Sequence, residues 1–194
     1  MLREQVRRQV GRAAEPSAAI IYSQSVKTTD RGGEHGYDGG KKVSGRKRHL
    51  LVDTLGLVLK AKVHAADIAD REGARLLLEP LKGVFPPLRH LWADMGYRGQ
   101  VLGWISAHLG WSVEVVKRPS KWGRYPIDVE PPPMPAFTVL PRRWVVERSF
   151  AWLGRYRRMS KDYEYLTASS EALIYAAMSR LMLRRLTQHP VRER

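Results

Sequence analysis

The chain has 194 residues, enough for one domain with a sizeable hydrophobic core, and its net charge of +15 favours a polyanionic partner such as nucleic acid. The absence of cysteine excludes a disulfide framework, a zinc knuckle and a thiol nucleophile, and it fits a reducing cytoplasm. No apolar run approaches the roughly 18 to 20 residues that span a bilayer, so we expect no membrane partner. A basic membrane-surface protein is the competing class, but it would need an amphipathic helix with a continuous apolar face.

Residues 1–17 are polar and basic, and they lack the apolar centre of a secretory signal. They contain too few apolar side chains to fold alone, so we interpret them as a basic N-terminal remnant, either a short helix or a frayed arm. Residues 187–194 form a basic C-terminal tail. Residues 18–186 are the expected domain.

The domain is expected to open with a buried strand over residues 18–27, where the β-branched Ile20 and Ile21 are followed at once by polar residues. Residues 28–45 contain six glycines together with Lys41 and Lys42, which predicts a flexible basic loop. The loop lacks the Walker arrangement of a nucleotide phosphate loop. Contact with DNA and simple solvation both stay open for it.

Residues 46–65 predict a β-hairpin that turns at Asp53. Its first strand is expected at residues 50–52, and residues 57–64 alternate as in a half-buried strand. We expect Asp53 to serve the turn rather than catalysis. The cationic residues at the start of the hairpin, before its first expected strand and next to the glycine-rich loop, are candidate DNA contacts: Arg46, Lys47 and Arg48.

Residues 70–82 predict a helix, because their apolar side chains share one face. Asp67 or Asp70 would cap its start. His64, Asp67 and Asp70 can also be imagined as metal ligands, but an Asp before a helix is ordinary capping, and we favour that interpretation.

An acid follows the next expected strand, which covers residues 88–94 and ends at Asp94. The carboxyl end of a buried strand is where open α/β sheets place their ligands. A helix over residues 100–109 and a strand over residues 111–116 come next. The proline-rich residues 119–139 predict an irregular connection.

A helix is expected to begin at Pro141, which suits a first helical turn, and to carry an apolar stripe that includes Val146 and Phe150. Glu147 lies beside this stripe between aromatic side chains, so we expect it to be partly desolvated. It either forms a structural ion pair with an arginine or binds a metal on a helix that also contacts phosphates. The candidate phosphate contacts on this helix are Arg142, Arg143, Arg148 and Arg155.

A final helix, capped by Ser169 or Ser170, is expected to run to Leu186. Three leading strands with short connections, followed by alternating helices and strands, predict an α/β domain. We expect a mixed five-stranded sheet flanked by helices, which is the ribonuclease H-like arrangement.

Five runs of the sequence carry a family resemblance: IIYSQSVKT, GKKVSGRKRHLLVDTLGL, HAADIADREGA, LWADMGYRG and LPRRWVVERSFAWLGRYRR. In this order they resemble the catalytic domain of transposases of the IS5 family, within the broader IS4-like DDE group. The resemblance covers roughly residues 18–186. It implies a ribonuclease H-like fold, two Mg²⁺ ions (or Mn²⁺), and DNA transposition through cutting and joining at insertion-sequence ends.

In that family three acids bind the metals: an Asp on the first strand, an Asp in a WAD-GY motif and a Glu in an RRW-VER-type helix. The resemblance places the second acid at Asp94 and the third at Glu147, with Arg143 matching the family's arginine. The first motif departs from the family pattern, because IIDSQSVK has become IIYSQSVK and Tyr22 stands in the place of the first acid. A neutral phenol with a pKa of about 10 is a poor magnesium ligand at pH 7.

Two hypotheses follow. The chain is either a DDE transposase, impaired because Tyr22 replaces the first catalytic Asp, or a catalytically inactive DNA-binding remnant of one. In both cases the expected partner is DNA, as insertion-sequence terminal repeats and target DNA, together with self-association. The expected location is the bacterial cytoplasm, at the nucleoid.

Overall fold

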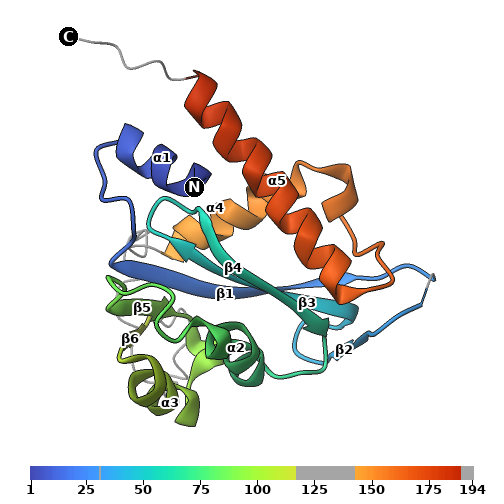
Figure 1. Ribbon diagram of the computed structural model, residues 1–194. Coiled ribbons are helices and arrows are strands. Elements are labelled where there is room, and N and C mark those ends of the chain that lie inside the picture. The colour runs from blue at the N-terminus through green and yellow to red at the C-terminus, as the bar shows by residue number, and fades with distance from the viewer. Residues whose placement is uncertain (31, 117–142, 189–194) are drawn as a thin grey trace, which may run out of the picture.

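The structure is a computed structural model that describes residues 1–30, 32–116 and 143–188. Figure 1 shows a central sheet with helices on both sides. In chain order the elements are α1 (Leu2–Gln9), β1 (Ala18–Lys27), β2 (Gly36–Asp38), β3 (Val43–Asp53), β4 (Val58–Ala65), α2 (Asp70–Leu78), the 3₁₀ helix η1 (Glu79–Leu81), β5 (His90–Ala93), the 3₁₀ helix η2 (Met95–Tyr97), α3 (Gln100–Leu109), β6 (Ser112–Val115), α4 (Arg143–Gly154), the 3₁₀ helix η3 (Arg157–Met159) and α5 (Thr167–Gln188).

The sheet is mixed and curled, with β1 at its centre. β1 pairs antiparallel with β3 and parallel with β5, which in turn pairs parallel with β6. On the other side of β3 lie both β2 and β4, each antiparallel to it. This gives an α/β domain whose central strand is the first one in the chain.

Within the described residues the sheet has six strands, where the sequence predicted five, because β3 begins at Val43 rather than Leu50 and pairs with the short β2. The extension depends on Gly45, where a Cβ would collide with the carbonyl oxygen of Val26 on β1. Part of the predicted flexible loop is therefore strand. The expected strand over residues 18–27 and helix over residues 100–109 coincide with β1 and α3. The predicted connection over residues 119–139 lies outside the described residues.

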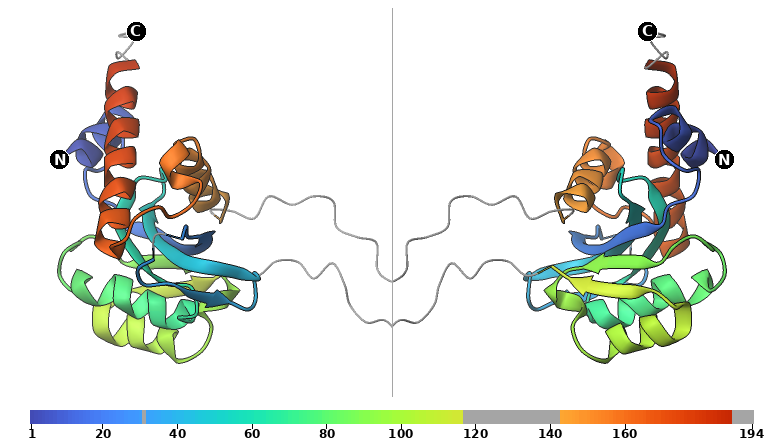
Figure 2. Two further views of the ribbon diagram at one scale, coloured as in Figure 1. Left: turned by 90° about the vertical axis from the view of Figure 1, so that its right-hand side faces the viewer. Right: turned by 90° about the vertical axis from the view of Figure 1, so that its left-hand side faces the viewer.

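Both faces of the sheet are buried, and each has its own apolar cluster. The face covered by α2 and α3, called here the α2 face, contains Ile21 and Leu51. The face covered by α4 and α5, called here the α4 face, contains Ile20 and Leu50. Figure 2 shows these layers from two sides, with α4 and α5 on one side of the sheet and α2 and α3 on the other. None of the described helices is both long and apolar enough to cross a membrane.

The helix α1 is a packed part of the domain, where the sequence left a short helix and a frayed arm both open. Val6 is buried in a small cluster with Leu57 and with Met182 of α5. Arg7 forms a buried ion pair with Asp53 at 2.5 Å. Asp53 also accepts hydrogen bonds from the backbone N–H groups that follow it in the β3–β4 turn, which confirms its predicted role.

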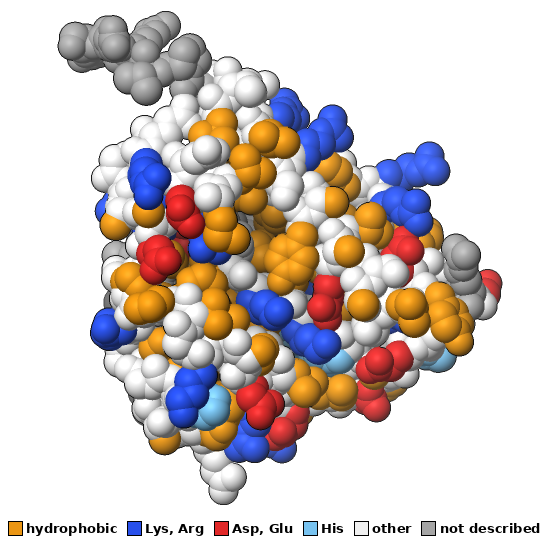
Figure 3. Space-filling model, viewed as in Figure 1, with side chains coloured by type: hydrophobic (Ala, Val, Ile, Leu, Met, Phe, Trp, Pro, Cys, Tyr) orange, Lys and Arg blue, Asp and Glu red, His pale blue; other side chains and the backbone are white. Residues whose placement is uncertain are grey.

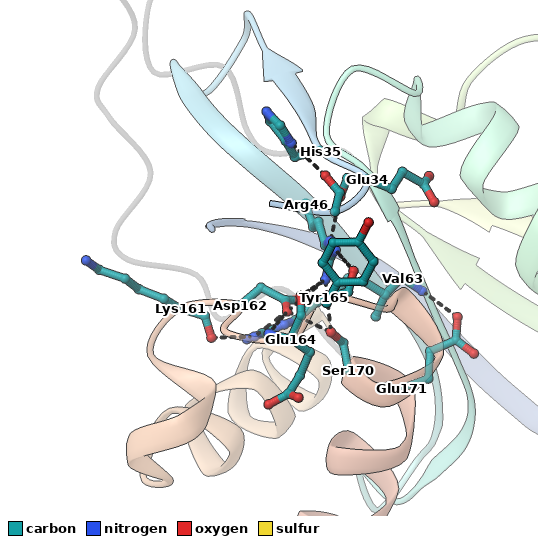
Figure 4. A network of polar contacts seen from close by, with 12 residues as sticks. Glu34, His35, Arg46, Val63, Lys161, Asp162, Glu164, Tyr165, Ser170 and Glu171 are labelled. Carbon is teal, nitrogen blue, oxygen red and sulfur yellow. Dashed lines mark hydrogen bonds and ion pairs between the residues drawn. The ribbon is translucent and has the colours of Figure 1, made fainter. Parts of the chain in front are cut away.

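A buried network around Arg46 joins β3 to the start of α5 (Figure 4). The Arg46 guanidinium donates to Asp162 Oδ1 at 3.1 Å and to the Tyr165 carbonyl oxygen at 2.7 Å. Ser170 Oγ donates to the same Asp162 oxygen at 2.7 Å, and Arg48 Nη2 lies 4.0 Å from the other oxygen of this carboxylate. Ser170 therefore serves this network, and α5 begins at Thr167 rather than at the predicted serine cap.

We predict that Asp162→Ala destabilises the fold by about 3–5 kcal/mol, because it leaves the buried guanidinium groups of Arg46 and Arg48 without their carboxylate. Urea denaturation followed by circular dichroism measures the loss. The control is Arg158→Ala, which removes an exposed ion pair with Glu164 and is expected to cost about 1 kcal/mol or less. Equal losses in the two variants would contradict the assigned role of Asp162.

Candidate active site

Tyr22 of β1 and Asp94, which directly follows the neighbouring parallel strand β5, line one pocket. Ile20 of β1 is paired with Trp92 of β5, so the residues two positions further along each strand project from the same face. Those residues are Tyr22 and Asp94. The pocket that they share is also lined by Ile20, Ile21, Trp92, Ala93, Val116 and Val146.

Tyr22 occupies the α4 face of the central strand. It is half-buried, and its ring meets the ring of Phe150 on α4 edge-on, with centroids 6.3 Å apart. A phenol packed in this way fills part of the pocket with a ring, and it presents no carboxylate oxygen there. The position that the resemblance assigns to a metal-binding Asp is therefore beside Asp94 in space, but its side chain is unsuited to bind Mg²⁺ at neutral pH.

Asp94 directly follows β5 and starts the 3₁₀ helix η2. Its Oδ1 accepts a hydrogen bond from the Gly96 N–H at 2.9 Å, so the carboxylate caps this short turn. Gly96 also touches the first residue of α2: a Cβ added at Gly96 would lie 2.7 Å from Asp70 Oδ2 and 3.1 Å from Asp94 Oδ1. The two carboxylates thus flank the same glycine.

Glu147 lies on α4, and its side chain is exposed. The expected partial burial of Glu147 between aromatic rings is wrong. Phe150 points into the core, and Trp144 is 46% exposed. The guanidinium carbon of Arg148 lies over the Trp144 ring, 4.2 Å from its centroid. The pocket receives Val146 from α4, and Glu147 is not among the described residues that line it. Glu147 is therefore next to the pocket along the chain without contributing to its wall.

The expectation that Arg46, Lys47 and Arg48 contact DNA is corrected by their burial within β3. Successive side chains of a strand point to opposite faces, so Arg46 and Arg48 enter the α4 face and Lys47 enters the α2 face. Arg48 donates to the carbonyl oxygens of Met159 and Lys161, while Lys47 donates to that of Ile68. All three cationic side chains are hydrogen-bonded or ion-paired to other groups of the protein, so none of them is available to neutralise a phosphate.

The remaining candidate DNA contacts differ in whether their side chains are exposed to solvent. Lys41, Lys42 and Arg155 are exposed. Arg148 is held between Trp144 and Trp152 and donates to a backbone carbonyl, which gives it a structural role. Arg142 and the Arg143 side chain lie outside the described residues. On the face in Figure 3, Lys and Arg side chains occur in small groups with acids between them.

A polar cluster that the sequence did not predict lies on the α2 face behind Asp94. Asp70 accepts from Ser23 Oγ at 2.9 Å and lies 3.2 Å from Lys47 Nζ. The predicted capping role of Asp70 is wrong, because Ala69 is the N-cap of α2 and no side chain caps this helix. Among the described residues, no group of three or more His, Cys, Asp or Glu is placed to hold a metal ion, so the alternative ligand set with His64 is not supported either.

Two buried histidines extend the polar cluster. The rings of His49 on β3 and His64 on β4 are 4.8 Å apart. Burial lowers the pKa of His49 well below its usual range and also lowers the pKa of His64. The Tyr97 hydroxyl lies 3.0 Å from His49 Nδ1, and burial followed by the charges of Asp70 and Asp94 raises the pKa of this phenol. Both histidines are therefore neutral in the folded protein at pH 7.

We predict that the protein loses stability as the pH falls from 7.5 to 5. Because both folded-state pKa values are lowered, the unfolded chain binds protons first, and stability that is complete above about pH 6.5 declines below it. The decline is up to about 1.4 kcal/mol per pH unit for each histidine until its folded-state pKa is reached. Urea denaturation at each pH measures it, and a His49→Asn, His64→Asn variant should give a flatter profile. Parallel profiles would contradict the assignment.

In a comparison with known protein families, a family model described as a transposase DDE domain matches residues 13–182, a span that includes Tyr22, Asp94 and Glu147. No curated protein matches the sequence closely enough to count as a relative.

Proposed function

Since the chain belongs to the family of transposases with a DDE domain, we propose that it descends from an enzyme of the IS5 group that binds insertion-sequence ends and cleaves and transfers DNA strands. We further propose that Tyr22 impairs this copy. The observation that carries the proposal is the shared pocket of Tyr22 and Asp94, formed where the central strand and its parallel neighbour meet.

The sheet supports a ribonuclease H-like assignment within this proposal. The first long strand, β1, is central, the antiparallel strands β3 and β4 lie on one side, and the parallel strands β5 and β6 lie on the other. In this arrangement an acid on β1 and an acid after β5 would face each other across one strand gap. Tyr22 and Asp94 occupy those two positions.

The residues present do not fit a pair of Mg²⁺ ions. Displacement at phosphorus by two metals needs both ions held by hard oxygen ligands about 4 Å apart. Asp94 and Glu147 are carboxylates of the right type, but Tyr22 offers a neutral phenol. Lys47 and Ser23 already bind Asp70, which lies on the opposite face of the sheet. We therefore derive no catalytic step through a metal for the chain as it stands.

DNA is the proposed partner, as terminal repeats and target sites, in the bacterial cytoplasm. The net charge of +15 supports this, although buried arginines account for part of it. The exposed candidates are Lys41 and Lys42 beside β2, and Arg155 after α4. The second candidate function, an inactive DNA-binding remnant that occupies element ends, is favoured by Tyr22, because loss of a metal ligand does not remove the exposed cations.

We predict that DNA binding weakens steeply with salt, with a slope of about −0.9 in log affinity against log salt for each phosphate neutralised. The double variant Lys41→Ala, Lys42→Ala should make this slope shallower by about 1.8, because each lysine is expected to contact one phosphate. Fluorescence anisotropy with terminal-repeat DNA from about 50 to 200 mM salt measures the slope.

The matched control is Arg71→Ala, Lys82→Ala, which removes two exposed charges, one in the first turn of α2 and one just after η1. It should leave the slope unchanged. A parent slope near zero would contradict the claim that the protein binds nucleic acid, while equal effects of the two double variants would contradict the assignment of Lys41 and Lys42.

We predict that Tyr22→Asp raises the affinity for Mn²⁺ by at least about tenfold, because a carboxylate replaces a phenol beside Asp94. Isothermal titration calorimetry measures the affinity, and a nicking assay on terminal-repeat DNA measures cleavage. The parent is expected to show weak metal binding and little strand transfer. Tyr22→Phe is the control, since it changes the ring least and adds no ligand.

The variant Tyr22→Asp, Asp94→Asn separates the two positions. It should lose the metal binding that Tyr22→Asp gained, because the second carboxylate of the pocket is gone. If Tyr22→Asp and Tyr22→Phe bind Mn²⁺ equally, Tyr22 is not at the position of a lost ligand and the proposed site is wrong.

A further inference from the structure

We propose that Asp38 is a positioning residue for Lys41 and Lys42. Its carboxylate holds the β2–β3 turn in one conformation, so that the two exposed lysines are presented to neighbouring phosphates of a nucleic-acid strand. The inference rests on the proposed function, in which DNA is the partner, and deepens it by assigning one contact surface. The geometry that supports it lies beside β2 and does not involve the pocket of Tyr22.

The turn between β2 and β3 is built around the Asp38 side chain. Asp38 and Val43 are the last pair of the ladder, so residues 39–42 form the turn between them. Asp38 Oδ1 accepts hydrogen bonds from the N–H groups of Gly40 and Lys41, each at 3.0 Å. An aspartate that bonds the backbone two and three residues ahead fixes a turn in place of ladder bonds. The backbone of this glycine-containing turn is therefore set by a side chain.

The second carboxylate oxygen of Asp38 ties the turn to the body of the sheet. It accepts from Ser25 Oγ on β1 at 2.5 Å and lies 3.8 Å from Lys47 Nζ on β3. The Asp38 side chain is only 11% exposed. Burial raises the pKa of Asp38, but the hydrogen bonds from Ser25 and the Lys41 N–H, together with the charge of Lys47, lower it overall. The carboxylate is therefore ionised at pH 7.

The opposite end of β2 is held as well. Gly36 lies so close to Asp67, in the segment between β4 and α2, that a Cβ at this position would collide with the Asp67 carboxylate. Gly36 is also paired with Gly45, which packs directly against β1. The hairpin is thus fixed at its base and at its turn. The glycines that predicted a flexible loop allow close packing instead.

The backbone at Lys42 is strained. Its φ is 55°, and among the described residues it is the one non-glycine residue with a positive φ. Glycine or asparagine is the ordinary choice in this region, because a larger side chain crowds the backbone there. Strain of this kind is typical of functional positions. Lys41 and Lys42 are both exposed, so the strained turn presents its charges to solvent rather than to the core.

A turn that is fixed in advance favours binding, because a flexible glycine-rich loop would lose backbone entropy each time it bound. Asp38 is nevertheless an acid beside the proposed phosphate contacts. Charge alone would therefore make DNA binding tighter when this acid is removed, whereas a positioning role would make it weaker. The two explanations predict opposite signs for one substitution.

The first experiment compares Asp38→Ala with Asp38→Asn, which change the net charge equally. Asparagine keeps an Oδ1 acceptor for the Gly40 and Lys41 N–H groups, and alanine does not. In fluorescence anisotropy with terminal-repeat DNA, Asp38→Ala should bind about five- to tenfold more weakly than the parent, with a shallower salt slope. Asp38→Asn should bind at least as tightly as the parent. Equal affinities of the two variants, or tighter binding by Asp38→Ala than by the parent, would overturn the inference.

Hydrogen exchange reports on the turn itself. The Gly40 and Lys41 amides should exchange at least about tenfold faster in Asp38→Ala and at the parent rate in Asp38→Asn. The amide of Leu51, in the buried part of β3, should be unaffected and so reports on global stability. Parallel acceleration of all three amides would show a merely structural role. Faster exchange in the turn with unchanged DNA affinity would show that the turn does not position the lysines, and either result would overturn the inference.

The double variant Lys41→Ala, Lys42→Ala tests whether Asp38 acts through the lysines. Adding Asp38→Ala to it should not weaken DNA binding further, because the positioned charges are already gone. A further loss as large as that in the parent would contradict the inference.

Lys42→Gly is a variant that leaves Asp38 intact. It relieves the positive φ, so the urea midpoint should stay or rise, while DNA affinity should fall by about fivefold because one phosphate contact is lost. Unchanged DNA affinity would contradict the inference. If the parent chain itself does not bind terminal-repeat DNA, the proposed function fails and the inference falls with it. That failure is distinct from the others, each of which starts from a parent that binds.

Discussion

Burial of both faces of the central strands is the constraint on which the rest of this structure depends. Every residue of β3 from Gly45 to Asp53 is buried, and β1 has buried residues on both of its faces, so the side chains there enter one apolar layer or the other. Charged residues in these strands must then find partners inside the protein. Arg46 forms an ion pair with Asp162, and this bond links the sheet to the chain just before α5. Lys47 forms an ion pair with Asp70, and this bond links the sheet to the start of α2.

The same alternation separates the candidate active site from its support. Tyr22 and Asp94 line a pocket on the α4 face, while Ser23 and Tyr97, their near neighbours in the chain, lie on the α2 face. The two faces are therefore separated by only one or two residues of backbone. The replacement of an acid by Tyr22 alters the pocket and leaves intact the Asp70 and His49 contacts behind it.

The sequence predicted the elements whose periodicity is undisturbed, including β1, α3 and the role of Asp53 in its turn. The prediction from sequence failed where the same local pattern is compatible with either a solvent-exposed or a buried position. Arg46, Lys47 and Arg48 look like a solvated basic run, and only pairing with distant residues such as Asp162 shows that they are core. Asp70 was predicted to be a cap for the same reason, since its partners in the structure, Ser23 on β1 and Lys47 on β3, are distant in the sequence. The pairing of Tyr22 with Asp94 came from family resemblance, because no local signal joins positions so far apart.

The central claim is that Tyr22 occupies the position of a lost metal ligand beside Asp94. Paramagnetic broadening by Mn²⁺ in nuclear magnetic resonance spectra of the ¹⁵N-labelled chain tests it most directly, because it locates the bound ion. With Tyr22→Asp, the amides of Ile21, Asp94 and Val146, which surround the pocket, should broaden first, and the parent should show no such selectivity at the same Mn²⁺ concentration. Identical broadening in the two proteins, or selective broadening far from this pocket, would contradict the account.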